Sequence, residues 1–307
     1  MISIIICSAN EKYLNEVKES IAKTIGCEYE ILAYENSKGE RGICEIYNQG
    51  AAEASYNTLC FMHEDIEYKT QDWGKIVLRI LSENPSLGLL GIAGSDYKSL
   101  APSSWFNFGE SEGFRGNHYM NLLQGFKFKE IEPIRELRNP KNEKLSKVAC
   151  IDGVWMCTTK EVFSKVKFDE FYLKGFHGYD LDYSLAINNI GLDVFVTFEI
   201  LIHHFSEGKY DKVWFTNIKE LHNKWSHNLP INYANLSSDE IAVVEKRMFR
   251  QFFTKYLNDG YSKKEMIEML ISSKRSQTMT LKLFMKLLFT TLKYQRKKVT
   301  EHTSTTQ

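Results

Sequence analysis

The chain contains 307 residues, of which 43% are hydrophobic, so it can bury a full core. Its 39 basic and 39 acidic side chains cancel, which excludes a global field that would recruit nucleic acid, and no uncharged apolar run approaches the roughly 20 residues that span a bilayer. We therefore expect a globular protein of one large domain with an appendage, or of two modest domains, without a nucleic-acid partner.

The cysteine pattern favours an intracellular setting. No CxxC pair occurs among the six cysteines, which lie at positions 7, 27, 44, 60, 150 and 157. The chain also opens on a strand-like run that lacks the basic and apolar regions of a signal peptide. We expect reduced thiols in a cytoplasmic protein.

In the first third of the chain, β-branched runs alternate with segments that carry apolar residues at helical spacing. The predicted strands cover residues 1–7, 29–34, 58–62 and 87–94. The predicted helices lie between them, at 13–25, 43–54 and 73–83. This alternation indicates an α/β fold with a mainly parallel sheet flanked by helices.

The middle of the chain is less regular. From residue 95 to about residue 147 the periodicity is lost in a segment rich in Gly, Asn, Ser and aromatic residues, which predicts a long functional or disordered loop. Order returns with strands at 148–159 and 193–202 and with helices at 160–166 and 179–190.

After Pro230 the sequence becomes helical and charged, and SSDE at 237–240 is a helix start. We expect a domain over residues 1–230 and a C-terminal helical extension over 231–307 with a disordered tail. Residues 280–298 form a basic amphipathic helix, which favours either peripheral contact with a membrane or packing on the same domain or on a homodimer partner.

Polar side chains follow three of the predicted strands, and ligands of such sheets bind outside the carboxyl ends of the strands. These side chains are Ser8, Asn10 and Glu11; Glu35 and Asn36; and His63, Glu64 and Asp65. No GxGxxG or P-loop motif is present, so bound phosphates would need another partner. Asp65 with a distant histidine would suit Mn²⁺ or Mg²⁺, which can clamp a diphosphate.

Each of these residues also has a plainer interpretation. Asp65 alone could be a turn residue, His204 a histidine at a strand end, and Glu64 a solvated side chain. Alternation along the strand nevertheless places His63 and Asp65 on the same side, which favours a shared site. Asp180, in the first turn of its helix, fits either a helix cap or a general base.

In this order, the motifs resemble those of glycosyltransferase family 2, which has the GT-A fold, and most of all its bacterial glycosyltransferase-like branch related to the streptomycin biosynthesis StrF domain. The motifs are YNQGAAEA (47–54), LCFMHEDIE (59–67), IDGVWMCTTKEV (151–162), GFHGYDLDYSLA (175–186) and HHFSEG (203–208). The resemblance covers about residues 1–228, and its most specific block runs from 151 to 208.

The resemblance implies a role for each matched position. HED at 63–65 occupies the DxD position, with His63 in place of the first Asp, and Tyr179 replaces the acidic neighbour of the catalytic base Asp180. The implied donor-binding residues are Ser8, Asn10, Glu11, Glu35, Asn36, Glu64 and Asp65. The implied acceptor or sugar residues are Asp152, Gly153, Trp155 and Asp182. The implied metal ligands are Asp65, His63 and His204, with His203 as the alternative if the strand register slips by one residue.

These roles describe an inverting transfer of a sugar from a nucleotide-diphosphate sugar to a hydroxyl acceptor, with Mn²⁺ or Mg²⁺ as cofactor. The resemblance and the basic helix together suggest a saccharide or lipid-linked saccharide acceptor in bacterial surface polysaccharide synthesis, at the inner face of the plasma membrane. The alternatives are a catalytically degenerate sugar-nucleotide-binding protein and a metal-dependent hydrolase. A sugar-nucleotide pyrophosphorylase is disfavoured, because SANEKYL after the first strand is not a Gly-rich basic loop.

Overall fold

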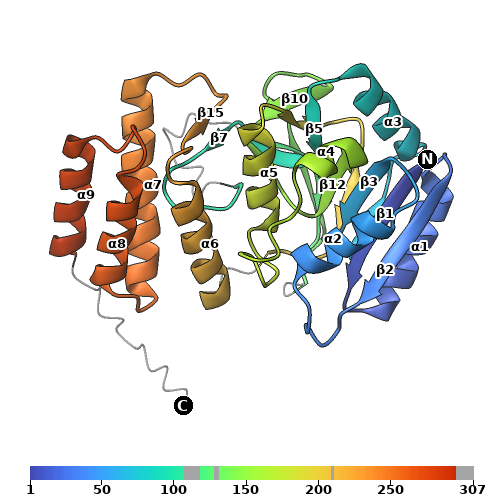
Figure 1. Ribbon diagram of the computed structural model, residues 1–307, viewed down its shortest axis with the longest axis horizontal. Coiled ribbons are helices and arrows are strands. Elements are labelled where there is room, and N and C mark those ends of the chain that lie inside the picture. The colour runs from blue at the N-terminus through green and yellow to red at the C-terminus, as the bar shows by residue number, and fades with distance from the viewer. Residues whose placement is uncertain (107–117, 128–130, 209–210, 295–307) are drawn as a thin grey trace, which may run out of the picture.

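A mixed sheet runs through the first two thirds of the chain (Figure 1). The computed structural model describes residues 1–106, 118–127, 131–208 and 211–294. Within these ranges the strand order across the sheet is β10 (Leu145–Val148), β13 (Asp193–Thr197), β5 (Leu87–Gly91), β12 (Trp155–Thr159), β3 (Thr58–Met62), β1 (Ile2–Ser8) and β2 (Tyr29–Glu35).

The first strands pair as the β-branched runs predict. β1 lies parallel to both β2 and β3, and β13 lies parallel to β5. β12 runs antiparallel between β3 and β5, and β10 runs antiparallel to β13 at the edge. All five residues of β3 are buried, as expected for a strand covered on both faces. The α/β prediction is confirmed, and the antiparallel strands add a feature that periodicity alone did not reveal.

Helices cover both faces of this sheet because alternate residues of each strand point to opposite sides. α1 (Glu11–Thr24) and α3 (Trp73–Glu83) pack on the face that includes Ile4. α2 (Ile43–Glu53), α4 (Lys160–Lys165) and α5 (Tyr179–Asn189) pack on the opposite face, which includes Ile5. The carboxyl ends of β1 and β3 are thereby left accessible at one edge.

A smaller sheet lies beside that edge. Its strand order is β11 (Cys150–Ile151), β6 (Ala93–Ser95), β8 (His118–Gln124), β14 (Ile202–His204) and β4 (Ile66–Tyr68), with β9 (Ile134–Arg138) paired to β8. The predicted strands 87–94 and 193–202 are therefore each divided between the two sheets. The predicted loop 95–147 is wrong at β8, β9 and β10, which are strands ordered by pairing rather than by an apolar pattern, whereas residues 99–106 and 139–144 are irregular as expected. The rest of that loop, at 107–117 and 128–130, lies outside the described residues.

The C-terminal helices share a core with the sheet domain. The elements are α6 (Lys212–Trp225), α7 (Ser238–Asn258), α8 (Lys263–Ser273) and α9 (Leu281–Lys293), and β15 (Ile231–Asn232) pairs with β7 (Tyr97–Lys98). One cluster of buried residues joins Leu181 and Leu185 of α5 to Phe249 and Phe252 of α7. The helical extension is thus present as predicted, and it packs on the preceding domain; the expected disordered tail at 295–307 lies outside the described residues. Among the described helices, none is long and apolar enough to cross a membrane.

Candidate active site and metal centre

The turn between β3 and β4 carries three ionisable side chains. His63 directly follows β3, and its backbone N–H donates to the carbonyl of Val154 (3.0 Å). β4 then pairs antiparallel with β14, which places His204 opposite Ile66 and lets the N–H of Phe205 bond the carbonyl of Asp65 (3.0 Å). Strand pairing therefore brings His63, Asp65 and His204 together from distant parts of the sequence.

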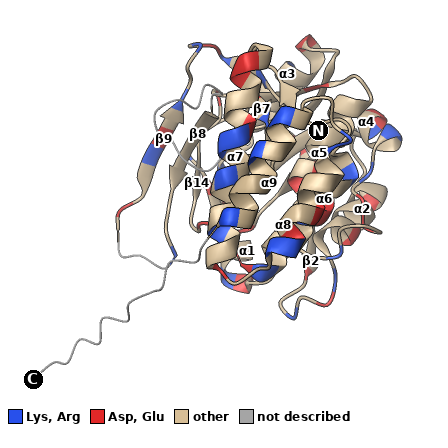
Figure 2. Cartoon of the chain, turned by 90° about the vertical axis from the view of Figure 1, so that its left-hand side faces the viewer, with Lys and Arg blue, Asp and Glu red and all other residues tan. Residues whose placement is uncertain are grey.

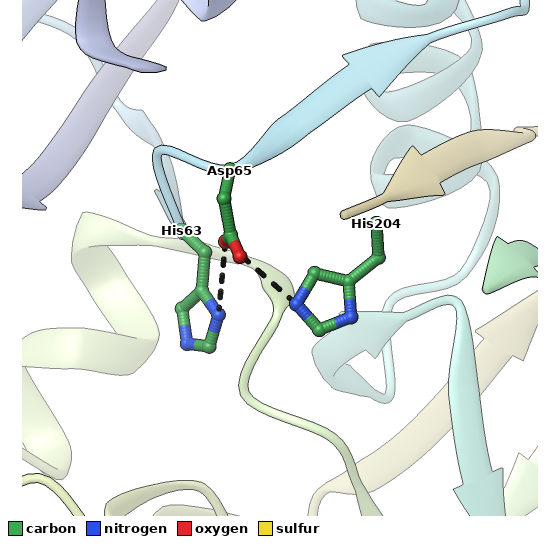
Figure 3. Close-up of side chains that lie close together, drawn as sticks. All are labelled: His63, Asp65 and His204. Carbon is green, nitrogen blue, oxygen red and sulfur yellow. Dashed lines mark ion pairs between the residues drawn. The ribbon is translucent and has the colours of Figure 1, made fainter. Parts of the chain in front are cut away.

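These three side chains point toward one another (Figure 3). Asp65 Oδ1 lies 3.8 Å from His63 Nδ1 and 3.7 Å from His204 Nε2, and one ligand atom from each residue lies within 4.8 Å of the others. The distances are too long for hydrogen bonds, yet short enough for a shared cation. The buried His204 Nε2 has no hydrogen-bond partner, while Asp65 Oδ2 accepts a bond from Ser206 Oγ (2.6 Å). This set of two imidazoles and one carboxylate fits a divalent transition metal such as Mn²⁺ better than it fits Mg²⁺, which prefers oxygen ligands.

The surroundings of Asp65 and His204 favour the protonation states in which these two side chains bind a cation. Burial alone would raise the pKa of Asp65, but the nearby His204 and His63 and the bond from Ser206 lower it overall. Burial lowers the pKa of His204 despite the neighbouring Asp65 carboxylate. At neutral pH this favours an ionised carboxylate beside a neutral imidazole.

His203 takes no part in this cluster. Its Nδ1 lies 3.9 Å from Glu67 Oε2, because successive residues of β14 point to opposite faces. The observed register therefore selects His204, and the alternative of a one-residue slip is not the arrangement found.

A cavity of about 590 Å³ opens beside the cluster at the carboxyl ends of β1 and β2. Asn10, Asn36, Glu64 and Asp65 line it. Its other lining residues include Tyr13, Lys38 and Lys127, which sequence reasoning missed; Lys127 comes from the segment predicted to be a loop. The cavity is large enough for a nucleotide, and its two lysines would favour an anionic ligand.

Glu64 stabilises the turn between β1 and α1, which forms one wall of this cavity. Its carboxylate accepts bonds from Ser8 Oγ (2.5 Å), the N–H of Ala9 (3.0 Å) and the N–H of Asn10 (3.2 Å). Glu64 is half-buried rather than fully solvated. Its contacts, and that of Ser8, are with the protein itself.

The other residues expected to hold the donor differ in their placement. Asn10 caps α1 through its side chain, and Asn36 is buried and bonds the backbone of Arg41 in both directions (2.9 and 3.2 Å). Glu35 is exposed and turns back to the N–H of Ser37 (2.9 Å). Glu11 is exposed on α1, and neither glutamate lines the cavity.

A second cavity of about 270 Å³ adjoins the first, and both are lined by His63 and Phe176. Asp152, Gly153, Asp180 and His204 also line the second cavity. The His63–Asp65–His204 cluster therefore lies between the two cavities. Such a layout can hold one reactant on each side of a cation.

Asp180 lies in the first turn of α5, which begins after Gly178 at a positive φ of 81°. Its carboxylate accepts bonds from the N–H of Gly153 (3.1 Å) and of Leu181 (2.9 Å). Burial, reinforced by the nearby charge of Asp152, raises the pKa of Asp180 to about 7. A carboxylate poised near neutrality at a cavity wall is well matched to general-base chemistry.

Asp152 and Gly153 shape the part of the cavity wall next to Asp180. Asp152 accepts bonds from the indole N–H of Trp105 and from the N–H of Val154 (2.7 Å). A Cβ at Gly153 would collide with the hydroxyl group of Tyr179, so only glycine permits this close approach. Trp105 was missed from sequence because it lies in the apparently irregular segment.

Trp155 and Asp182, expected beside the acceptor, lie elsewhere, which corrects that expectation. Trp155 is fully buried, and its indole N–H donates to Tyr68 Oη (2.9 Å). Asp182 is 3% exposed and joins α5 to α6 through bonds from Trp225 Nε1 (2.7 Å) and Lys224 Nζ (2.8 Å). Neither residue lines a cavity of the site. Their positions in the matched motifs reflect packing.

The family model of the "Glycosyltransferase like family" matches residues 3–229. The chain belongs to this glycosyltransferase-like family. The name of the family indicates glycosyl transfer as its general activity. The matched residues include those that line both cavities and those of the His–Asp–His cluster. The sequence has no significant match among curated proteins.

Three solved structures are similar to this chain, and the TM-score of one of them exceeds 0.5. S. aureus TarS 1–349 aligns over 92% of this chain and 82% of its own, with a TM-score of 0.52 and 14% identity. TarS 1–349 in complex with UDP aligns over 94% and 80%, with a TM-score of 0.48 and 14% identity. GalNAc-T7 with UDP, GalNAc and Mn²⁺ aligns over 73% of this chain and 48% of its own, so this chain spans about half of that structure, with a TM-score of 0.48 and 12% identity. Together with the matched family, the TarS alignment confirms the predicted GT-A glycosyltransferase fold.

Proposed function

We propose that this family member is an inverting glycosyltransferase that uses a nucleotide-diphosphate sugar and a divalent cation. The observation that carries the proposal is the position of the His–Asp–His cluster between a nucleotide-sized cavity and a smaller cavity lined by Asp180. The donor would occupy the larger cavity, with its diphosphate toward the cluster. The acceptor hydroxyl would enter the smaller one.

His63, Asp65 and His204 are the residues that would hold the divalent cation, with Mn²⁺ preferred over Mg²⁺ because two of the three ligands are imidazoles. When bound, the cation offsets the negative charge that develops on the leaving diphosphate. Lys38 and Lys127 line the same cavity and would add positive charge near the donor. The turn fastened by Glu64 keeps Asn10 at the cavity wall, where it can contact the nucleoside.

Asp180 would act as general base. It takes the proton of the acceptor hydroxyl as that oxygen forms a bond to the anomeric carbon, while the bond from this carbon to the diphosphate oxygen breaks on the opposite face. The anomeric configuration is thereby inverted, through a transition state with oxocarbenium character. The bonds that Asp180 accepts from Gly153 and Leu181 orient its carboxylate at the cavity wall.

The proposal is tested by calorimetric titration of UDP-, GDP- and dTDP-sugars, with and without Mn²⁺, into wild type and Asp65→Ala. We expect one nucleotide class to bind in a Mn²⁺-dependent manner and to bind less tightly to the variant. The absence of binding under every condition would contradict the donor site and favour a metal-dependent hydrolase. Binding without transfer to any acceptor would identify a degenerate sugar-nucleotide-binding protein.

The outer faces of α7 and α9 support a finer proposal, that the acceptor is a lipid-linked saccharide at an anionic membrane. On α9, exposed apolar residues recur at Leu281, Met285, Phe289 and Leu292, and an adjacent row holds Lys282, Lys286 and Lys293. α9 carries no acidic residue. A groove of about 840 Å³ separates Lys282 and Lys286 from Lys246, Arg247 and Arg250 of α7. Figure 2 shows this basic face.

This charge complements anionic headgroups, and the apolar row would enter the interface between headgroups and acyl chains. Each lysine near an anionic surface contributes about fivefold to binding, so Lys282→Gln/Lys286→Gln should weaken vesicle binding about 25-fold. Sedimentation with phosphatidylcholine vesicles, with and without phosphatidylglycerol, measures this, and Lys23→Gln/Lys165→Gln on α1 and α4 is the matched control. A protein that never sediments with the anionic vesicles contradicts the proposal, and concentration-dependent dimers would assign the face to a second copy.

A further inference from the structure

The hydroxyl group of Tyr179 contacts both the His63 ring and the backbone carbonyl of Gly153. We propose that Tyr179 is a positioning residue, which fixes the tautomer and orientation of His63 so that Nδ1 faces the cation. The inference rests on the proposed cation site and assigns a role to a residue outside the His63–Asp65–His204 cluster.

We assign the protons of Tyr179 and His63 from the two hydrogen-bond partners of Tyr179 Oη. Tyr179 Oη donates its proton to the carbonyl of Gly153 (3.2 Å) and lies 2.8 Å from His63 Nε2. A tyrosine hydroxyl has one proton, so an oxygen that donates to Gly153 must accept from His63. Nε2 of His63 therefore carries the proton, and Nδ1 keeps its lone pair.

Nδ1 of His63 is the nitrogen that faces the cluster. It lies 3.8 Å from Asp65 Oδ1, too far for a hydrogen bond and on the side where His204 Nε2 also points (Figure 3). With Nδ1 protonated instead, an N–H would point into a site built from acceptors. The partner of the distal nitrogen thus decides whether His63 can bind a cation, as is general for metal-binding histidines.

The Tyr179 ring is held rigidly enough to impose this choice. It is 4% exposed and packs edge-on against Tyr47, with ring centroids 5.8 Å apart. On the other side it lies so close to Gly153 that a Cβ there could not be accommodated. The hydroxyl group therefore has little freedom to leave the line between Gly153 and His63.

The first test compares the Mn²⁺ affinity of wild type, Tyr179→Phe and Tyr183→Phe, measured by calorimetry. Removing the group that bonds the other ring nitrogen of a metal-binding histidine typically weakens metal binding about 10–100-fold. We expect a loss of this size for Tyr179→Phe. Tyr183 lies one turn further along α5, is fully buried and lines neither cavity, so Tyr183→Phe is the matched control and should bind as wild type does. Unchanged affinity in Tyr179→Phe would overturn the inference while leaving the cation site standing.

A double-variant cycle separates positioning from general loosening of the site. In a His63→Asp background the ligand is a carboxylate without tautomers, so adding Tyr179→Phe should change Mn²⁺ affinity less than twofold. An equal loss in both backgrounds would contradict the proposal. Wild type that binds no Mn²⁺ would refute the cation site and this inference together.

A second readout needs no metal. The ¹⁵N chemical shifts of the His63 ring distinguish the two neutral tautomers. Wild type should show protonated Nε2, and Tyr179→Phe should show a mixture. Protonated Nδ1 in wild type would overturn the assignment.

Discussion

Burial of Asp180 destabilises the folded chain when the carboxylate is ionised, but it also suits this group to accept a proton in the proposed mechanism. Its carboxylate is held by two backbone N–H groups, yet burial and the neighbouring Asp152 charge still raise its pKa to about 7. Such a group binds a proton more readily in the folded chain than in the unfolded chain. The same environment that prepares Asp180 to accept a proton should therefore weaken the fold at high pH.

The rate of transfer should follow the ionisation of Asp180. In the proposed mechanism Asp180 must be deprotonated to accept the proton of the acceptor, so kcat/KM should fall as pH decreases through about 7 and should level off above it. Asp152→Asn removes a charge that raises this pKa, so its acidic limb should shift to lower pH, whatever its maximal rate. A pH–rate profile of both proteins measures the shift, and coincident profiles would contradict the coupling.

The stability of the fold should depend on the same ionisation of Asp180, but stability should fall as pH rises, whereas the rate should increase. The folded-state pKa of Asp180 is raised, so its contribution to stability is complete below the unfolded value near 4 and is lost as pH rises through about 7. The asparagine in Asp180→Asn cannot ionise. The difference in Tm, variant minus wild type, should therefore be more positive at pH 8 than at pH 5. Thermal unfolding at these two pH values checks this; a constant difference would count against the buried charge.

At the scale of elements, the 97–105 segment links the C-terminal helices to the smaller of the two cavities, which Trp105 lines. Glu245 of α7 accepts bonds from Tyr97 Oη (2.5 Å), Ser99 Oγ (2.9 Å) and the N–H groups of Leu100 and Ala101 (3.0 and 3.2 Å). The same segment ends at Trp105, which bonds Asp152. α7 thereby helps to hold a wall of the cavity in place.

Loss of the Glu245 carboxylate should therefore be costly. Glu245→Ala leaves several buried donors without a partner and should lower the free energy of unfolding by about 3 kcal/mol. Asp239→Ala, on the exposed first turn of the same helix, is the control and should cost about 1 kcal/mol or less. Urea denaturation compares the two, and equal losses would show that the buried network contributes nothing of its own.

At the scale of the whole molecule, the elements predicted correctly were those whose own residue pattern indicates that they are buried. Strands 1–7 and 58–62 are mostly apolar runs, and they form the neighbouring inner strands β1 and β3 of the mixed sheet. β9 (IRELR) has no such pattern, because pairing with β8 defines it. Alternation brought His63 and Asp65 together correctly, whereas the choice of His204 needed the observed pairing of β14 with β4. Trp155 and Asp182 were misplaced because motif position does not reveal which way a side chain points.

The shared core makes a further prediction about the extension. Residues 231–307 follow the matched family region, yet α7 buries Phe249 and Phe252 in one cluster with α5 and α6. A chain of residues 1–230 would expose this apolar surface and should be recovered aggregated rather than as a folded monomer. Size-exclusion chromatography with circular dichroism tests this, and a soluble, cooperatively folding fragment would show that the extension is an independent appendage.

The most direct test of the proposed mechanism is to measure single-turnover sugar transfer by wild type and Asp180→Asn at saturating donor. Donor affinity is determined in parallel. Loss of a general base should reduce turnover by about 10²–10⁴-fold and leave donor affinity nearly unchanged, because Asp180 lines only the smaller cavity. Equal turnover by the two proteins would contradict the assignment of Asp180 as the base for glycosyl transfer.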